Sequence, residues 1–569
     1  QSGLYVRGGG PDQNLIILDD ATVYNAYHLF GFFSLFNGDA IRSIELTKGG
    51  FPARYGGRLS SVLDINMKEG SKETLKGEAG IGLISSRVTL EGPIAKGKSS
   101  FLVSGRRTYI DALIQPFVAT AGYNAGYFFQ DFTGKVNFDL GKKDRLFLSA
   151  YTGKDKFYYR DRNLGLDTRA NMQWGNLTST LRWNHVYNPK TFSNLSAIFS
   201  QYNLNIGFES KFDNEKFDMR FTSGIRDFTL KYDVDYMPNT RNTFKFGAIS
   251  TYHTFTPNAV VIKESSSNLN IEDIERVETF ESGVYVQDDF RLSYKWRMLA
   301  GLRLSHFVVG SYQTLRPEPR FSTSYMLGKR TSIKGSFAEM NQYIHLLSNT
   351  GVGLPTDLWV PATERIKPQR SRQVAAGISH DIRRPELTVS LEGYYKRSYD
   401  IIAYREGASF LAVDDPFSGK KNSWENNVTT GNAEAYGMEL LIEKKKGKFT
   451  GWVGYTLAWI WHDFNDLNNG KRFHPKYDRR HDISVVGIYE FSENFTFSAT
   501  WVYGTGNAIS LPLAYHNQYG TPDQNDLIGA KGYGTYYGDK NTFRMAAYHR
   551  FDVSLQFHKQ KPRFERTWE

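Results

Sequence analysis

The chain has no cysteine among its 569 residues and no long uninterrupted apolar run. Without cysteine it can form neither a disulfide framework nor a thiolate zinc site, and thiol chemistry is excluded. Two longer uncharged stretches, residues 21–38 and 112–130, are interrupted by Asn, His, Gln and Pro, so neither is predicted to be a transmembrane helix. A mean hydropathy of −0.47 also argues against a helical membrane protein.

Signatures of catalysis are missing as well. The chain has no Gly-x-Ser-x-Gly elbow, no Walker loop and no His-Glu-x-x-His sequence. His462, His474 and His481 lie in one region but lack the regular spacing of a metal site. Residues 478–482 (DRRHD) resemble a catalytic cluster, but neighbouring side chains on a strand point to opposite faces, so we expect a structural network. We therefore predict a protein that is not an enzyme and uses no cofactor and no metal.

Charge of one sign is not concentrated in any segment. The net charge is +11 and the isoelectric point is about 9.2, but Lys and Arg are spread along the chain, often beside Asp or Glu. A nucleic-acid-binding domain would carry a basic stripe or block. We therefore predict no nucleic-acid partner, and we attribute the positive balance to anionic lipid head groups or an anionic ligand.

Aromatic residues are abundant, at 15% of the chain, and many segments alternate apolar with polar residues. Clear cases are residues 135–140, 387–396, 495–503 and 551–558. A period of two predicts strands in a sheet with two different faces, and about ten residues suffice for a tilted strand to cross a bilayer. A large soluble β-sandwich is the alternative, whereas a propeller is disfavoured because no blade motif repeats at a fixed period.

The connections between these segments also alternate in length. Short turns are predicted at 141–144, 188–190, 237–240, 328–330, 445–448 and 492–494, and long loops at 256–279, 341–369, 404–430 and 504–544. Short turns on one side and long loops on the other are typical of outer-membrane barrels. Counting hairpins gives roughly twenty strands, close to the plugged transporters of about 22 strands.

The first 70 residues differ from the rest, because short apolar runs at 15–18 and 44–46 alternate with glycine turns. This pattern is typical of a small mixed domain. We predict an all-β membrane protein, a large antiparallel transmembrane β-barrel of about 22 strands with an N-terminal α/β plug domain in its lumen. Residues 1–70 form the C-terminal part of the plug. Residues 71–569 form the barrel, whose final strands are expected to be missing because residues 557–562 read as a turn close to the end of the chain.

Four motifs follow one another in this first stretch: Arg7-Gly8-Gly9, residues 14–20 (NLIILDD), residues 40–45 (AIRSIE) and residues 53–65 (ARYGGRLSSVLDI). In this order and spacing they resemble the second half of the plug of TonB-dependent outer-membrane receptors, in the branch related to SusC- and RagA-like receptors. Segments 285–290, 301–303, 318–322, 436–440 and 477–482 resemble later strands of the same receptors. The resemblance covers nearly the whole chain, but the upstream half of the plug and a TonB box are absent from it.

The resemblance implies a multi-pass barrel in the outer membrane of a Gram-negative bacterium, in contact with outer-membrane lipids. It implies import of a scarce or bulky nutrient, with the plug gated by TonB and with a surface lipoprotein as a further candidate partner. The substrate is left open, since a siderophore, glycan, peptide or cobalamin would each fit. A docking subunit for surface lipoproteins or protein secretion is the alternative function, and a passive porin is disfavoured because the plug would fill the channel.

Two sets of candidate functional residues follow. In the plug, glycine permits positive φ and arginine offers a rigid fork for a carboxylate. Together they predict a latch that holds the plug to acidic groups of the barrel wall. The other interpretation is ordinary tight turns with solvated arginines. Aromatic rings in the long loops stack on sugars or apolar ligand groups, or else form a loop core or girdle, and prolines stiffen residues 354–361 so that this loop could shape a pocket or dock a lid. The latch set is Arg7, Gly8, Arg54, Tyr55, Gly56, Gly57 and Arg58, and the loop set is Tyr343, His345, Trp359, Tyr404 and Trp424.

Overall fold

The computed structural model describes residues 3–120, 122–163, 166–213, 215–264, 269–348, 357–406, 408, 424–519, 531–561 and 564–568. The chain divides into two compact units. The first comprises Gln1–Thr323, Ser336–Arg372 and Ile402–Thr430, and the second comprises Ser324–Gly335, Gln373–Ile401 and Gly431–Glu569. The N-terminal plug belongs to the first unit.

The plug is a four-stranded sheet in the order β2-β1-β6-β5. Its strands are β1 (Asn14–Leu18), β2 (Ala21–Thr22), β5 (Ile41–Thr47) and β6 (Ser61–Met67), with β1 parallel to β6. Alternate residues of a strand point to opposite faces, so Ile16 and Leu18 join one apolar cluster and Ile17 another. The apolar run at 15–18 is therefore buried on both faces of this sheet, whereas Ile44 and Leu46 of the run at 44–46 are 60% and 41% exposed.

The segment between β2 and β5 contains β3 (Tyr27–His28) and β4 (Phe33–Ser34). The described part of the plug has no α-helix; it has three 3-10 turns, η1 (Pro11–Gln13), η2 (Leu29–Gly31) and η3 (Gly38–Ala40). This differs from the α/β plug expected from the sequence. Residues 22–39 are rich in aromatic residues and glycine, which are weak helix formers.

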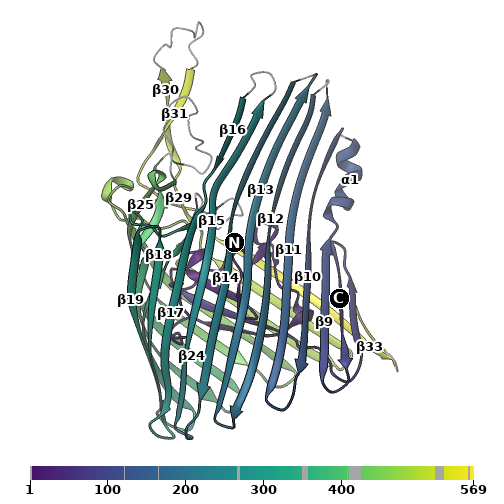
Figure 1. The fold of residues 1–569 in the computed structure, drawn as a ribbon, viewed down its shortest axis with the longest axis vertical. Helices are drawn as coiled ribbons and strands as arrows, with labels where there is room; N and C mark the ends of the chain where they lie inside the picture. The colour runs from purple at the N-terminus through teal and green to yellow at the C-terminus, as the bar shows by residue number, and fades with distance from the viewer. Residues whose placement is uncertain are drawn as a thin grey trace. The chain divides into compact units, whose positions relative to one another are not determined.

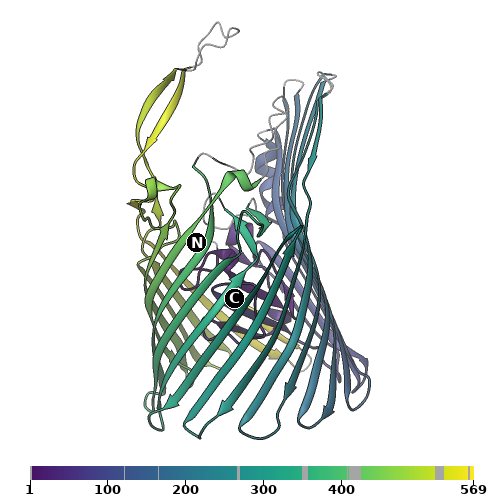
Figure 2. The same ribbon diagram turned by 60° about the vertical axis from the view of Figure 1, so that its left-hand side comes forward.

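Long antiparallel strands form a wall beside the plug in the first unit. Figure 1 shows the purple plug behind β14, and Figure 2 shows it on the same inner side of these strands after a 60° turn. The strands are β7 (Lys76–Ile81), β8 (Ser85–Ala95), β9 (Ser99–Thr108), β10 (Tyr123–Asp139), β11 (Asp144–Asn163), β12 (Leu166–Asn188), β13 (Thr191–Phe212), β14 (Glu215–Tyr236), β15 (Asn242–Glu264), β16 (Leu269–Ile274), β17 (Val277–Arg291) and β18 (Trp296–Val309).

The two faces of this wall differ in polarity. We call the face that contacts the plug inward and the opposite face outward. On β10, the inward Lys135 and Asn137 are 3% and 2% exposed, whereas the outward Phe132 is 52% exposed. The alternation predicted for residues 135–140 is therefore confirmed, and its polar side is the buried one because it meets the plug. A polar inward face and an apolar outward face are the pattern of a membrane barrel.

The remaining long strands are β19 (Tyr312–Met326), β20 (Thr331–Gln342), β23 (Gln369–Ile382), β24 (Leu387–Tyr404), β25 (Val428–Lys444), β26 (Phe449–Asp463), β27 (His481–Ser492), β28 (Phe495–Gly504), β33 (Tyr548–Lys561) and β34 (Phe564–Trp568). The order of hydrogen-bonded neighbours runs from β10 to β20, then β23 to β28, β33, β34 and β7 to β9, a closed barrel of 22 strands among the described residues. The predicted strand number is confirmed. The turn predicted at 557–562 is wrong over its described residues, because β33 continues to Lys561 and pairs with β34.

The six predicted short turns are confirmed, since each lies between consecutive strands. The long loop predicted at 256–279 is wrong. Strand β15 continues to Glu264, β16 occupies Leu269–Ile274, and β17 begins at Val277. The β-branched residues Val260, Val261 and Ile262 favour the extended chain, so these strands run on where a loop was expected.

A helix that the sequence did not predict, α1 (Ile110–Thr120), follows β9. Strand β10 begins at Tyr123, but its pairing with β9 starts only at Gln130. The helix contacts β10, beyond the end of β9. Among the described residues, none of the helices is at once long and apolar enough to span a membrane.

In the second unit, β26, β27, β28 and β33 pair antiparallel in sequence order. The predicted apolar face of β33 is confirmed, because Phe551, Val553, Leu555 and Phe557 are all 47–65% exposed. Hairpin β30 (Pro512–Tyr519) and β31 (Lys531–Tyr537) and the short pair β29 (Ala508–Ile509) and β32 (Phe543–Arg544) lie between β28 and β33 in sequence.

The polar cluster at 478–482 is a structural network, as predicted, but for a different reason. Asp478 and Arg480 precede β27 rather than alternating along it, so they converge on one point. The fully buried Asp478 carboxylate accepts from the N–H of Ile460 at 2.9 Å and lies 3.5 Å from Arg480 Nη2. No cluster of three or more metal-ligating side chains occurs in the described part of the chain.

Candidate functional site between plug and wall

The second predicted latch segment lies in the plug loop of residues 51–60, which precedes β6. Gly57 has φ +76°, a conformation that favours glycine. A Cβ at Gly57 would lie 3.0 Å from Oε1 of Glu281, and one at Gly56 would lie 2.3 Å from Nε of Arg303. Both partners are inward side chains of the wall, on β17 and β18. The two glycines therefore permit a close approach of the wall to the plug backbone.

Wall side chains bind the backbone of this loop directly. Arg320 on β19 donates through Nη1 to the carbonyl oxygens of Pro52 at 2.8 Å and Tyr55 at 2.5 Å. Gln287 on β17 accepts from the backbone N–H of Ala53 at 2.8 Å. The plug loop is thus held through its main chain, and the two bonds from Arg320 are charge-assisted and therefore of the stronger kind.

Sequence reasoning missed the wall arginines as latch residues. Arg303 and Arg320 were noticed only within segments that resemble the receptor family. A signal was nevertheless present, because each arginine lies in an alternating strand and a period of two places it on one face. Glu318, fully buried, holds Arg320 at 2.6 Å and so fixes the direction of its guanidinium.

The predicted latch residues Arg54 and Tyr55 make side-chain contacts as well. Arg54 Nη2 lies 3.9 Å from Oδ2 of Asp233 on β14, and its guanidinium lies over the Tyr55 ring. The Tyr55 hydroxyl donates to Asp64 of the plug at 2.8 Å. Arg54 therefore reaches a wall carboxylate, as the prediction required, while Tyr55 stabilises the loop from within the plug.

Arg58 and Arg7 have different surroundings. The Arg58 guanidinium lies 6.0 Å from the ring centroid of Tyr24 and 5.8 Å from that of Trp359, a cation–π arrangement. Arg7 is buried in the first plug loop at φ +47°, followed by Gly8 at φ +71°. The structure thus distributes the predicted set over two plug loops, and the gating role of the set stays a prediction.

His28 of the plug lies between two wall aspartates. Its Nε2 is 2.6 Å from Asp131 and its Nδ1 is 2.6 Å from Asp155, and its ring stacks on Phe129. Burial opposes the charged imidazole, but the hydrogen bonds and charges of the two aspartates outweigh it and raise the pKa of His28. Because carboxylates only accept, both ring nitrogens donate and the ring is an imidazolium. The histidine therefore joins the plug to the wall through two ion pairs.

Two aspartates after the end of β1 make three further ion pairs to the wall. Asp19 lies 2.8 Å from Lys135, with both side chains 3% exposed. Asp20 lies 2.9 Å from Lys231 and 3.4 Å from Arg182. Burial raises the pKa of Asp20, but Lys231 and Arg182 outweigh this effect and hold it well below its usual range. The plug is therefore held in large part by paired charges and polar groups, which water can replace when the contact opens.

A hairpin formed by β21 (Ile344–Leu347) and β22 (Leu358–Pro361) packs on the plug. Asp12 of the plug accepts from Gln342 Nε2 at 2.8 Å and from the N–H of Leu346 at 3.3 Å. The His345 Nδ1 lies 2.9 Å from Gln369 Nε2. Burial and the charge of Arg58 lower the pKa of His345 to about 3, so its ring is neutral.

The structure brings the predicted loop residues together as core rather than as exposed ligand contacts. Tyr343 and His345 are fully buried, and Trp359 and Trp424 are 4% and 6% exposed. Trp359 and Trp424 belong to one apolar cluster, against which the half-buried Tyr404 packs. The alternative of a loop core therefore describes this conformation, and a ligand role for these residues stays a prediction.

The wall, the plug and the polar interface between them can be compared with known proteins. A family model described as "TonB dependent receptor-like, beta-barrel" matches residues 104–568, and one described as "TonB-dependent Receptor Plug Domain" matches residues 1–61. The chain belongs to the TonB-dependent receptor family. It is therefore an outer-membrane receptor of Gram-negative type, and its family is one of receptors and transporters rather than enzymes.

Solved structures of TonB-dependent receptors share this fold at low sequence identity. The ferripyoverdine receptor of Pseudomonas aeruginosa is 13% identical, with 97% of this chain and 75% of that chain covered and a TM-score of 0.64. The FrpB iron transporter of Neisseria meningitidis is 12% identical, with 97% and 85% covered and a TM-score of 0.63. The ferric yersiniabactin uptake receptor FyuA of Yersinia pestis is 13% identical, with 97% and 83% covered and a TM-score of 0.64. None of the curated protein sequences matches this chain.

Proposed function

We propose that this TonB-dependent receptor imports a scarce or bulky nutrient across the outer membrane, and that force from TonB moves the plug to open the path. The observation that carries the proposal is the polar interface between plug and wall. Arg320 on plug carbonyls, His28 between two aspartates and the Asp19–Lys135 pair are all contacts that water can take over once the plug moves. An interface of this kind holds the plug at rest and allows its displacement.

The substrate class to test first is a ferric chelate. Its support is that the three similar structures are described as a ferripyoverdine receptor, an iron transporter and a ferric yersiniabactin receptor. Membership of the SusC- and RagA-like branch and a surface lipoprotein partner stay predictions from the sequence. The ferric-chelate substrate is tested by measuring uptake of iron-55 chelates by cells with and without the receptor, in the presence and absence of TonB.

The plug movement can be tested by tethering the loop to the wall. An ideal Cβ at Gly301 on β18 lies 2.9 Å from the Cβ of Ala53, which is shorter than the spacing of about 3.8 Å in a disulfide, so the bridge forms once the loop moves away by about 1 Å. The chain has no cysteine, so Ala53→Cys with Gly301→Cys adds the only possible disulfide. We expect uptake of the nutrient to fall to background in the oxidised double variant and to return after reduction.

The two single-cysteine variants, treated with the same oxidant and reductant, are the matched controls and should transport throughout. Full uptake by a double variant whose disulfide is shown to be complete by mass spectrometry would contradict plug movement in this loop. If a deletion strain instead keeps its nutrient uptake and loses a surface assembly, the docking role predicted as the alternative would replace import.

A further inference from the structure

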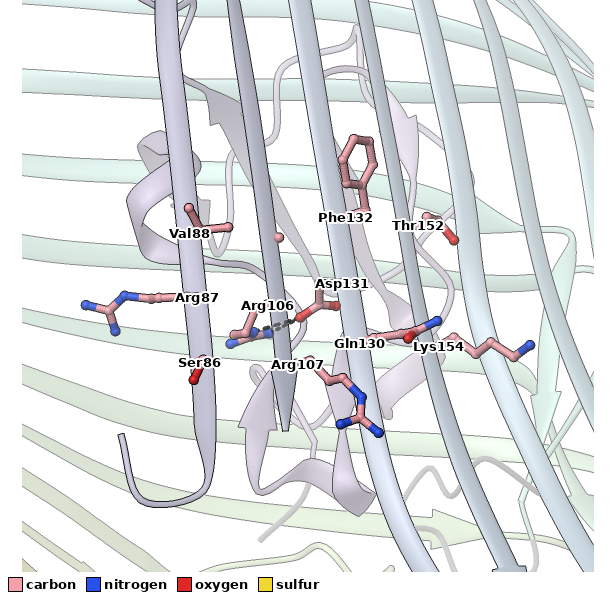
Figure 3. Close-up of a pocket in the computed structure, with 11 residues that line it drawn as sticks. Ser86, Arg87, Val88, Arg106, Arg107, Gln130, Asp131, Phe132, Thr152 and Lys154 are labelled. Carbon is pink, nitrogen blue, oxygen red and sulfur yellow. Dashed lines mark hydrogen bonds and ion pairs between the residues drawn. The ribbon is translucent and has the colours of Figure 1, made fainter. Parts of the chain in front are cut away.

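A hollow of about 500 Å³ lies at the wall on strands β8 to β11, away from the latch contacts. The inward residues here are known from their plug contacts: Arg106 donates to the carbonyl of Ser34 and pairs with Asp131. Because side chains alternate along a strand, Gly105, Arg107 and Phe132 face outward. Figure 3 shows the Arg106–Asp131 pair, with Arg107 directed away from it. The hollow therefore opens outward over Gly105, because glycine has no side chain to fill this position.

The outward lining of this hollow has two chemically different ends. At one end Val88 and Phe132 expose 48% and 52% of their surface. At the other end, on the side of the wall that leads to α1, Arg107, Gln130 and Lys154 line the hollow. The hollow thus lies across the boundary between apolar residues of the wall and the first polar row above them, which is the level of lipid head groups in a membrane barrel.

The two cations keep free hydrogen-bonding capacity. Arg107 donates from Nη2 to Asp111 of α1 at 3.0 Å and lies over the Phe128 ring, which leaves most of its five N–H donors available. Lys154 has no acidic partner within the part of the chain that the structure describes. By contrast, the inward arginines of the same lining, Arg87 and Arg106, are neutralised by Asp39 and Asp131.

We propose that this hollow binds one membrane lipid with a phosphorylated head group. Arg107 and Lys154 bind the phosphate by charge-assisted hydrogen bonds, and an acyl chain lies over Gly105 between Val88 and Phe132. A neutral lipid would leave Lys154 and the remaining donors of Arg107 without an anionic partner at the head-group level, and a free phosphate ion would leave the apolar half of the hollow unfilled. The proposed lipid contacts are made by outward side chains of the wall, so the proposal does not depend on the proposed import function.

Gly105→Leu tests the acyl half without changing a charge. The nearest atom to a Cβ at Gly105 is the carbonyl oxygen of Asp131 at 3.8 Å, an ordinary contact, so the wall can accept the new side chain. Arg107→Gln with Lys154→Gln tests the phosphate half. The matched control is Lys142→Gln with Lys295→Gln, an exposed and a half-buried lysine in short turns of the same unit. Folding is checked for each by the shift in gel mobility on heating.

The measurement is native mass spectrometry of purified receptor titrated with dioleoyl phosphatidylglycerol, and in parallel with dioleoylglycerol, which lacks the phosphate. We expect a single phosphatidylglycerol adduct that is unchanged in the control, weakens about tenfold in Gly105→Leu, and weakens at least about tenfold in the charge variant, which loses two charge-assisted contacts. Equal binding of dioleoylglycerol, an undiminished adduct in Gly105→Leu, or displacement of the lipid by millimolar inorganic phosphate would each overturn the proposal. If the charge variant fails to fold, Gly105→Leu decides alone.

Discussion

At the scale of single residues, Gly56 of the plug loop matters because its missing side chain leaves room for Arg303 of the wall. Arg303 is 2% exposed and is confined between Gly56 of the plug and Gly283 of β17, where a Cβ would lie 2.3 Å and 2.4 Å from its guanidinium atoms. Its Nε also donates a hydrogen bond to Oγ of Ser305 at 3.1 Å. An arginine confined in this way cannot adopt another rotamer without a clash. A side chain added at Gly56 would therefore destabilise the contact between plug and wall.

Gly56→Ala is therefore expected to loosen the loop of residues 51–60. We expect a destabilisation of this contact by about 1–3 kcal/mol, the usual cost of overpacking, seen as faster hydrogen exchange of the Ala53 and Tyr55 amides by mass spectrometry. Gly38→Ala is the control, because nothing lies within 4 Å of its added Cβ. Equal exchange in both variants would mean that Arg303 does not confine the loop.

At the scale of elements, the hairpin β21–β22 carries a buried neutral histidine. Its pKa is about 3 in the closed hairpin, below the usual value of 6.5, because of burial and Arg58. Opening lets His345 take up a proton, so the closed form loses stability as the pH falls below about 6.5. His28 has the opposite sign: its pKa is raised by two aspartates, so its contact holds at low pH and weakens as the pH rises through that raised value.

Acid should therefore open the hairpin before it releases the plug. At pH 5 we expect the closed hairpin to be weaker by about 2 kcal/mol than at neutral pH, from about 1.5 pH units of differential protonation. Hydrogen exchange of peptides covering 344–347 and 358–361 should accelerate from pH 7 to pH 5, after correction for intrinsic rates, while peptides around His28 stay protected. His345→Gln should remove the pH dependence; an unchanged dependence would assign it to another group.

The elements show where sequence reasoning works. Strict alternation was sufficient for β10 and β33, because the strands of a membrane barrel need two faces of opposite polarity. It was insufficient for α1, whose residues 112–120 look like an uncharged loop and become helical where β10 lacks a β9 partner. It left open whether Trp359 and Trp424 bind a ligand or form a loop core, because a period does not tell whether an aromatic loop turns outward or folds onto the plug.

At the scale of the whole molecule, the closed order of 22 strands and the plug were both predictable, the first from the alternation and turn lengths and the second from the four ordered motifs. The latch was only half predictable. The motif pointed to Arg54, but the partner bonds come from Arg320 and Gln287, more than 200 residues away in sequence. Pairings of this kind depend on strand register, which a single sequence does not contain.

Deleting residues 1–70 should convert the receptor into an open channel. The wall strands keep their own ladders, and their inward face is already polar, so we expect the barrel to fold and its lumen to fill with water. Single-channel recordings in planar bilayers should show a stable conductance for the deletion variant and none for the intact chain. A folded deletion variant that does not conduct would mean that other segments close the lumen.

The bonds from Arg320 to plug carbonyls have an evolutionary consequence. A bond to a main-chain oxygen does not depend on which side chain that residue carries. Positions 52 and 55 can therefore drift to other amino acids without losing these bonds, provided the turn keeps its shape, whereas Arg320 and the glycines at 56 and 57 cannot. Across natural variants, selection should thus fall unevenly, with tolerance in the plug loop side chains and constraint on the wall residue that binds their backbone.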